Sequence, residues 1–324
     1  MLYRRSHFIR LGAASLAPFV RWDPAAAATP ETLRVMLFPT DGVKTLLWAQ
    51  QQGLFAKHGV TAEFIKMANG AATIPALVGG SGEIGAGSLF PMFAAHARGL
   101  PIKLVAPASL YLSDHADSLL LVATDSPFRT ARDLNGKVLG VDSLNDVYTL
   151  ATRAWVDQNG GDGQSVKATE IPAVQAFAAL TAGRIDAAVF KTPYASIALN
   201  TGKARLLGKP LDAIAPRILL SAWIATESFI AKDPQAIAGF QAGVREAAPY
   251  TNAHPEATVD LIAKFSGQEP EQVRNSVRAT SAVTVTLPEL QRPLDFAVRY
   301  GLIPKAFDVH EMLAPGFPLS NVSS

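Results

Sequence analysis

Polar residues follow an apolar run in the segment DSLND (142–146), at the point where a helical pattern begins. If Ser143 is the N-cap of that helix, the first-turn N–H groups and the helix dipole favour a negatively charged ligand group, such as a sulfonate, carboxylate or nitrate. Asn145 could contact the same group. Ser143 and Asp146 equally have the spacing of a capping box, in which side chains satisfy the helix start without a ligand. The sequence leaves both interpretations open.

The remaining strand–helix junctions supply further candidates, because ligands of open α/β sheets bind beyond the carboxyl ends of the strands. Lys191 could be the counter-charge of an anion or a solvated surface lysine. Asp41 could cap the first helix or accept a hydrogen bond from an amine; with Lys191 on the opposite wall it would suit a zwitterion such as taurine. Aromatic candidates could stack on a planar ligand or simply pack the interior. The candidate ligand-binding residues are Thr40, Asp41, Ser88, Leu89, Tyr111, Ser143, Asn145, Lys191, Tyr194 and Trp223.

Catalytic and metal-binding signatures are missing from the sequence. There is no cysteine, which excludes thiolate zinc sites, thiol nucleophiles and a lipid-modified N-terminal cysteine. No Gly-x-Ser-x-Gly, His-Glu-x-x-His or Ser-His-Asp set occurs. The segment SDHADS (113–118) contains metal-ligand residue types, but their spacing fits no standard site. We therefore expect no enzyme, no metal and no cofactor.

The elements that must position these residues alternate between short apolar runs and helix-length segments. Strands are predicted near 33–38, 61–67, 83–88 and 102–108, and again at 138–141, 166–171, 186–190 and 204–208. Segment 43–59 reads as one helix, and the helix after 141 is expected at 144–159. Such alternation predicts an α/β fold with mainly parallel sheets and flanking helices.

Two α/β series followed by a helical tail indicate two lobes. We expect the first lobe to comprise residues 29–124 plus 219–324, and the second to comprise residues 125–218. The chain would then cross between the lobes near 122–125 and near 220–225. Two crossover strands form a hinge, so the cleft between the lobes is the expected ligand site.

The first 28 residues have the character of an export signal. Arg4, Arg5 and Arg10 precede a weakly apolar stretch, and an Ala-x-Ala site allows cleavage after Ala28. The paired arginines favour the twin-arginine route. Because this segment carries four arginines against one aspartate, the remaining chain is near −1 although the whole sequence is +2. That balance gives no reason to expect nucleic acid or an anionic membrane as a partner.

Four segments, in order along the chain, resemble the solute-binding proteins of ABC importers. They are AQQQGLFAKHGV (49–60), ARDLNGKVLGV (131–141), LTAGRIDAAVFKTPYASIA (180–198) and SAWIATESFIAKDP (221–234). The similarity is to the branch that serves nitrate, alkanesulfonate, taurine and thiamine-pyrimidine uptake. Members often carry an acidic residue or Trp before the Pro-Tyr that follows Asp-Ala-Ala. Lys191 lies in that stretch here and would turn the cleft towards an anion.

This resemblance implies a two-lobed periplasmic binding protein fold (type II) that closes on its ligand. It implies a monomer that is exported to the periplasm, soluble and not lipid-anchored, with an ABC permease and its ATPase as partners and only transient contact with that membrane complex. The ligand expected first is a small organic anion such as a sulfonate, taurine or nitrate. A pyrimidine or thiamine precursor, or an aromatic carboxylate, is the alternative, and an enzyme on the same scaffold is the weakest one.

Overall fold

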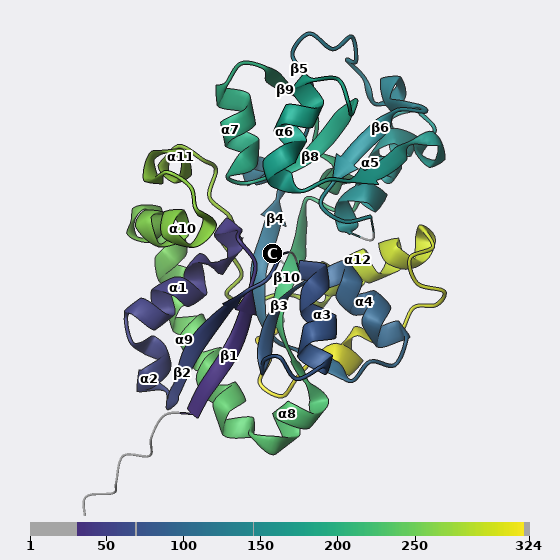
Figure 1. Cartoon of the computed structure of the whole chain (residues 1–324). Helices are drawn as coiled ribbons and strands as arrows, with labels where there is room; N and C mark the ends of the chain where they lie inside the picture. The colour runs from purple at the N-terminus through teal and green to yellow at the C-terminus, as the bar shows by residue number, and fades with distance from the viewer. Residues whose placement is uncertain (1–30, 69, 145, 321–324) are drawn as a thin grey trace, which may run out of the picture.

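The computed structural model describes residues 31–68, 70–144 and 146–320, and it folds into two α/β lobes between which the chain crosses twice (Figure 1). The expected export signal, residues 1–28, lies outside the described residues. Within the described ranges no helix is long and apolar enough to cross a membrane.

Lobe 1 is built on a six-stranded sheet with the strand order β11-β4-β10-β3-β1-β2. Its strands are β1 (Glu31–Leu37), β2 (Val60–Lys66), β3 (Ile84–Ser88), β4 (Ile102–Leu112), β10 (Arg217–Thr226) and β11 (Thr280–Ser281). Strands β1, β2 and β3 run parallel to one another, whereas β10 is antiparallel to β3 and β4, and β11 is antiparallel to β4.

Helices cover both faces of this sheet, which is why its strands read as nearly continuous apolar runs. In β1, Leu33, Val35 and Leu37 face one buried cluster and Met36 faces another. The first face packs on α1 (Lys44–Gln51), α2 (Leu54–Lys57), α9 (Pro234–Ala253) and α10 (Val259–Ser266), and the second on α3 (Gly70–Val78), α4 (Leu89–Ala97) and α12 (Leu287–Arg299). The remaining helices of lobe 1 are α8 (Glu227–Lys232) and α11 (Pro270–Arg274).

Lobe 2 is built on a five-stranded sheet with the order β7-β6-β8-β5-β9. Its elements are β5 (Ser118–Ala123), β6 (Val138–Val141), α5 (Val147–Gln158), β7 (Lys167–Glu170), α6 (Ala173–Thr181), β8 (Ala187–Lys191), α7 (Tyr194–Asn200) and β9 (Ala204–Gly208). Strand β6 is parallel to β7 and β8, and β5 is antiparallel to β8 and β9. The α/β class is confirmed, but both sheets are mixed and not mainly parallel.

The first crossing between the lobes lies earlier in the chain than predicted. Because β5 pairs with β8 and β9, it belongs to lobe 2, and the chain crosses at residues 113–117 and not near 122–125. It returns through residues 209–216, before β10 pairs along β4. The predicted single helix over 43–59 is also divided in two, since Gly53 adopts a left-handed conformation with φ 67° between α1 and α2.

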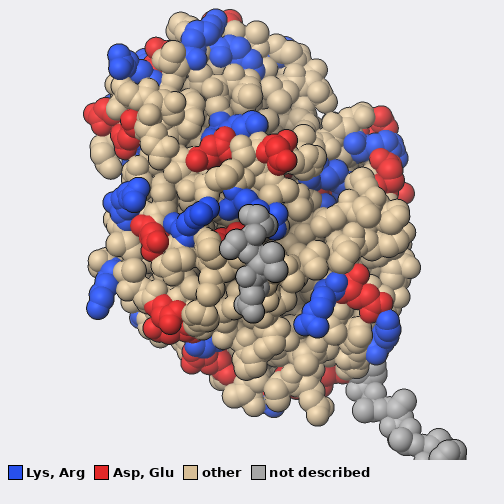
Figure 2. All heavy atoms as spheres, turned by 180° about the vertical axis from the view of Figure 1, so that it is seen from behind, with Lys and Arg blue, Asp and Glu red and all other residues tan. Residues whose placement is uncertain are grey.

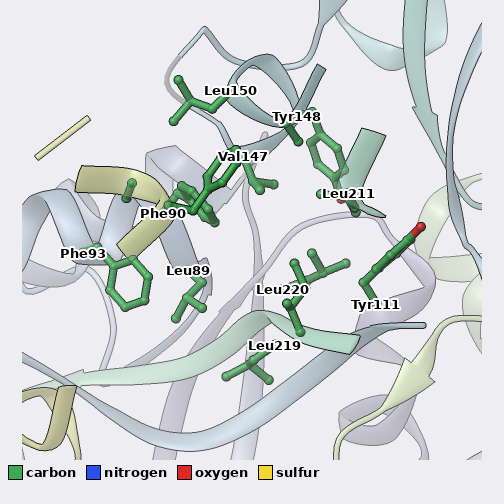
Figure 3. Close-up of a cluster of buried hydrophobic side chains, with 14 of the residues drawn as sticks. Leu89, Phe90, Phe93, Tyr111, Val147, Tyr148, Leu150, Leu211, Leu219 and Leu220 are labelled. Atoms are coloured by element: carbon green, nitrogen blue, oxygen red, sulfur yellow. The ribbon is translucent and has the colours of Figure 1, made fainter. Parts of the chain in front are cut away.

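The lobes share apolar contact beside the cleft. Val147 and Leu150 of α5 belong to the same buried cluster as Phe90 of α4 and Leu219 of β10 (Figure 3). On the face seen in Figure 2, basic and acidic side chains are interspersed and form no single-sign surface.

Candidate ligand-binding site

A cavity of about 280 Å³ lies between the lobes, at the carboxyl ends of parallel strands from both sheets. Lobe 1 contributes residues that follow β1 and β3 and the start of α3. Lobe 2 contributes the junctions β6–α5, β7–α6 and β8–α7. The polar lining residues are Thr40, Ser88, Asp142, Ser143, Asp146, Glu170, Lys191, Thr192 and Tyr194. We call this space the main cavity. A smaller pocket of about 50 Å³ adjoins it and extends to Asp41 and Asp117.

Lys191 is already paired with carboxylates of its own lobe. Its Nζ lies 2.7 Å from Asp142 Oδ2 and 3.9 Å from Asp146 Oδ2, and 4.9 Å from the ring centroid of Tyr148. Burial would lower the pKa of the ammonium, but the two carboxylates outweigh burial and raise that pKa above its ordinary value. Lys191 therefore stays charged, and its charge is balanced locally instead of being free for an anion.

The helix start that follows β6 differs from both interpretations of the sequence. Helix α5 begins at Val147, and its N-cap is Asp146, whose Oδ1 accepts a hydrogen bond from the Val147 N–H at 2.6 Å. Burial raises the pKa of Asp146, opposed by the Lys191 ammonium and by that N–H group. Ser143 precedes the helix by four residues, so the predictions that it is the N-cap or half of a capping box are wrong. It lines the main cavity from the preceding turn.

Lobe 2 thus presents an electronegative wall. Asp142, Asp146 and Glu170 line the main cavity against the single ammonium of Lys191. The Asp146 carboxylate also satisfies the positive end of α5, since an N-cap acceptor removes one of the free N–H groups there. The Lys191 ammonium and the Val147 N–H are thus paired with acidic side chains of the same lobe, whereas the start of α6, which also lines the main cavity, has no side-chain cap.

Lobe 1 presents a wall of the main cavity that carries no charged side chain among the described residues. Ser88 is the N-cap of α4 in an extended conformation, but its side chain makes no capping hydrogen bond, which leaves the first-turn N–H groups uncapped by it. Thr40 likewise precedes a 3₁₀ turn without a capping bond. Gly70 is required beside Ser88, because a Cβ there would lie 2.9 Å from Ser88 Oγ. The hydroxyl groups of Thr40 and Ser88 therefore line this wall beside apolar residues such as Phe38.

Asp41 forms a buried ion pair and does not cap the first helix as predicted. Its Oδ1 accepts hydrogen bonds from Arg278 Nε (2.9 Å) and Nη2 (2.6 Å), and its Oδ2 accepts one from the Ala279 N–H (2.7 Å). Lys44 Nζ lies 3.5 Å from Oδ2. Both carboxylate oxygens are thus occupied by protein donors, although Asp41 lines the smaller pocket.

The segment that Asp41 holds also contacts lobe 2. Thr192 Oγ1 donates to the Val277 carbonyl, and the Val277 N–H donates to Ser196 Oγ at 3.1 Å. Residues 277–279 therefore form an additional link between the lobes besides the two chain crossings at 113–117 and 209–216. No sequence signal pointed to it, because the partners are more than 80 residues apart.

Three predicted site residues lie in the interior and do not line either pocket. Leu89 is fully buried in α4 (Figure 3). Tyr111 lies within β4, which continues to Leu112 because it pairs with β10, and its hydroxyl donates to Asp212 Oδ1 at 2.6 Å. Trp223 lies within β10 and packs edge-on against Phe240 in the core. The stacking role foreseen for Tyr111 and Trp223 is not supported by their positions.

The main cavity does bring together Thr40, Ser88, Ser143, Lys191 and Tyr194, as the strand-end rule predicted. Asn145 lies outside the described residues. Sequence reasoning missed Asp142 and Glu170 of the acidic wall. Asp142 was in the segment considered first, and Glu170 is the last residue but one of the strand predicted at 166–171, so the same rule could have found both. Among the residues that the structure describes, no group of three or more His, Asp or Glu side chains could hold a metal ion.

Comparison with known proteins places this geometry in a family. A family model described as NMT1/THI5 like matches residues 42–258. A Brucella abortus protein provisionally named a binding protein is 30% identical over 227 residues, which are 67% of this chain and 66% of that relative. The chain thus spans slightly less than two thirds of the length of these relatives.

Solved structures share the fold at low sequence identity. The periplasmic aliphatic sulphonate binding protein SsuA of Escherichia coli superposes with a TM-score of 0.70 at 23% identity, covering 88% of this chain and 97% of that one. The alkanesulfonate-binding protein SsuA of Xanthomonas axonopodis pv. citri, bound to MOPS, gives 0.71 at 19% identity, covering 90% and 100%. The desulfurization enzyme DszB gives 0.65 at 17% identity, covering 88% and 97%.

These similarities establish the periplasmic binding protein fold, which is shared by binding proteins and an enzyme. The family match covers most of both lobes and includes Asp142, Asp146 and Lys191 of the main cavity. By that match, the chain belongs to the NMT1/THI5-like family.

Proposed function

We propose that this protein is the substrate-binding component of an ABC importer, which works in the periplasm as a monomer. It captures a small organic anion between its lobes and delivers it to a membrane permease with its ATPase. The family match, the sulfonate-binding proteins that share the fold and the position of the main cavity support this function. Export by residues 1–28 is part of the proposal.

The choice of ligand rests on the difference between the two cavity walls, since one is acidic and the other is uncharged with hydroxyl donors. The hydroxyl groups of Thr40 and Ser88 offer donors to an anion, whereas Asp142 and Glu170 favour a positive or N–H-bearing group. A molecule with a sulfonate at one end and an amine at the other matches both walls. Taurine is the simplest such zwitterion, and MOPS, the molecule bound to the Xanthomonas protein, also combines a sulfonate with an amine.

An aminopyrimidine or an aromatic carboxylate is the alternative ligand. Phe38 and Tyr194 both line the main cavity and could stack on a planar ring, whose N–H groups would bond to the acidic wall. Catalysis on this scaffold, as in DszB, is a weaker alternative, because the sequence offers no nucleophile–base set.

Thermal unfolding with a ligand panel tests the function. The panel holds taurine, ethanesulfonate, nitrate, hydroxymethylpyrimidine, thiamine and aromatic carboxylates. A ligand at a hundred times its dissociation constant stabilises the protein by about 2.7 kcal/mol. We expect the largest shift with taurine. If no compound raises the unfolding temperature, this ligand class is wrong.

One variant distinguishes a zwitterion from a simple anion. In Asp142→Asn the acidic wall loses a charge and the Lys191 ammonium loses its nearest partner, at 2.7 Å. Taurine should then bind more weakly and ethanesulfonate more tightly. The exposed Asp125, which lies outside both pockets, provides the control Asp125→Asn. Equal changes for the two sulfonates would refute the assignment of the amine to lobe 2.

A further inference from the structure

A second interlobe cavity of about 290 Å³ adjoins the main cavity. The two share Ala173, Val174 and Tyr194, at the starts of α6 and α7. The second cavity continues along those helices to the loop that joins α10 to α11, and Figure 1 shows α11 beside α7 at this edge of the molecule. We call this space the annex.

The lobe 2 side of the annex is apolar. Phe177, Phe190 and Ile197 line it, and Val174 stands at the junction with the main cavity. Val174 is 68% exposed, the largest exposed fraction recorded for a large hydrophobic side chain in the described part of the chain. An apolar surface at the mouth of a ligand cavity gains free energy when an apolar group of a ligand covers it.

A hydrogen-bonding group without a partner lies on the lobe 1 side. Both Nε2 and Oε1 of Gln268 are buried and have no hydrogen-bond partner among the described residues, although buried amides are usually paired. The backbone at the base of this side chain is held in place by the end of α10. Gly267 ends that helix with φ 75°, and the N–H groups of Gly267 and Gln268 both donate to the Ala263 carbonyl. The amide therefore lies in the wall of the annex with both a donor and an acceptor unused, and in this conformation neither atom is exposed to the cavity.

Size favours a ligand that occupies both spaces. Ligand cavities in proteins usually measure roughly 300–1,000 Å³. The main cavity and the annex, at about 280 and 290 Å³, each fall just below that range, and together they lie within it. Taurine alone would leave the annex and the Gln268 amide unused.

We propose that the natural ligand is an elongated molecule whose charged head lies in the main cavity and whose apolar body crosses Val174 into the annex. Its far end bears a hydroxyl or amide group that hydrogen-bonds to the Gln268 amide after this side chain turns into the annex. This inference rests on the proposed function and narrows its ligand class. Gln268 is the residue that determines specificity for the distal polar group.

Calorimetric titration of the full protein with taurine, N-hexyltaurine and N-(6-hydroxyhexyl)taurine tests the inference. Each methylene that is fully buried should tighten binding about fourfold. We therefore expect N-hexyltaurine to bind at least tenfold more tightly than taurine, and the terminal hydroxyl to tighten binding further. Gln268→Leu should abolish the additional gain from the hydroxyl and keep the gain from the chain.

Val174→Asp should remove the gain from the hexyl chain, whereas Leu206→Asp should not. Leu206 is 45% exposed on β9 and lines neither cavity, so it is a matched control. If taurine binds and the hexyl chain adds nothing, the annex proposal is wrong while the proposed function stands. If the hydroxyl gain persists in Gln268→Leu, the role of Gln268 is refuted. If none of the three compounds binds, the proposed head group fails and the annex proposal fails with it.

Discussion

Asp41→Ala is predicted to destabilise the ligand-free protein strongly. The Asp41 side chain is 2% exposed and that of its partner Arg278 is 10% exposed, so water screens this ion pair little. Three protein N–H groups donate to this carboxylate, and Lys44 lies 3.5 Å away. Removing it leaves two buried cations facing each other and the Ala279 N–H without its acceptor.

The magnitude follows from the burial. Breaking one side of a buried ion pair typically costs about 3–5 kcal/mol, because the remaining charge is left uncompensated. In a chain of this size that corresponds to a melting temperature lowered by about 6–10 °C. Burial already lowers the pKa of Lys44, and Asp41 opposes that shift, so the variant should also release the Lys44 proton more readily.

Guanidinium unfolding without ligand measures the effect, with Glu246→Ala as the control. Glu246 also contacts two basic side chains, Lys57 at 2.7 Å and His58 at 3.0 Å, but on the surface. Exposed pairs contribute little because water screens them. The reasoning is refuted if both variants shift the unfolding midpoint equally. Loss of taurine binding with unchanged stability would instead identify Asp41 as a ligand residue.

Three further perturbations test other parts of the structure. Burial, reinforced by the nearby Asp41 charge, raises the pKa of Asp117 to about 6, so the native state binds a proton that the unfolded state has released between about pH 4 and 6. The free energy of unfolding should therefore fall as pH rises through this range. An unfolding series against pH should lack this fall in Asp117→Asn. The same slope of stability against pH in the variant and the parent protein would contradict the prediction. Gly163→Ala places a Cβ 2.1 Å from the Arg153 carbonyl oxygen and should cost about 1–3 kcal/mol by forced displacement of backbone, measured by urea unfolding. Ser196→Ala removes the acceptor of the Val277 N–H and should speed hydrogen exchange at that amide. An unchanged exchange rate at Val277 would contradict this prediction.

Local sequence patterns predicted the elements and one half of the site. The strand-end rule located Thr40, Ser88 and Lys191 because it needs only the order of apolar runs and helix starts. The rule failed at Tyr111, since nothing in the sequence shows that β4 continues through Ser109 by pairing with the distant β10. The rule therefore places a residue at the cleft correctly only when the end of its strand is predicted correctly.

Pairing between distant residues was the part that the sequence could not supply. Lys191 was open to two interpretations, an anion counter-charge or a solvated surface lysine, and neither included its partner Asp142, which lies 49 residues earlier on a neighbouring strand end. Likewise Asp41 read as a helix cap because Arg278 is 237 positions away. In both cases a tertiary contact supplies a charged partner that the local sequence does not show.

The division of polarity between the lobes also bears on how closing could report the ligand. A ligand shifts an open–closed equilibrium only by the difference in its affinity for the two states. Under the proposed function, a simple anion would find its donors on lobe 1 and be opposed by the carboxylates of lobe 2, so closing would add little to its binding. A zwitterion reaches its second set of partners only when the lobes approach, and an apolar body in the annex adds contact with both. Under the proposed function, the dipolar ligand is therefore the one that would drive closure, and single-charge analogues should bind without it.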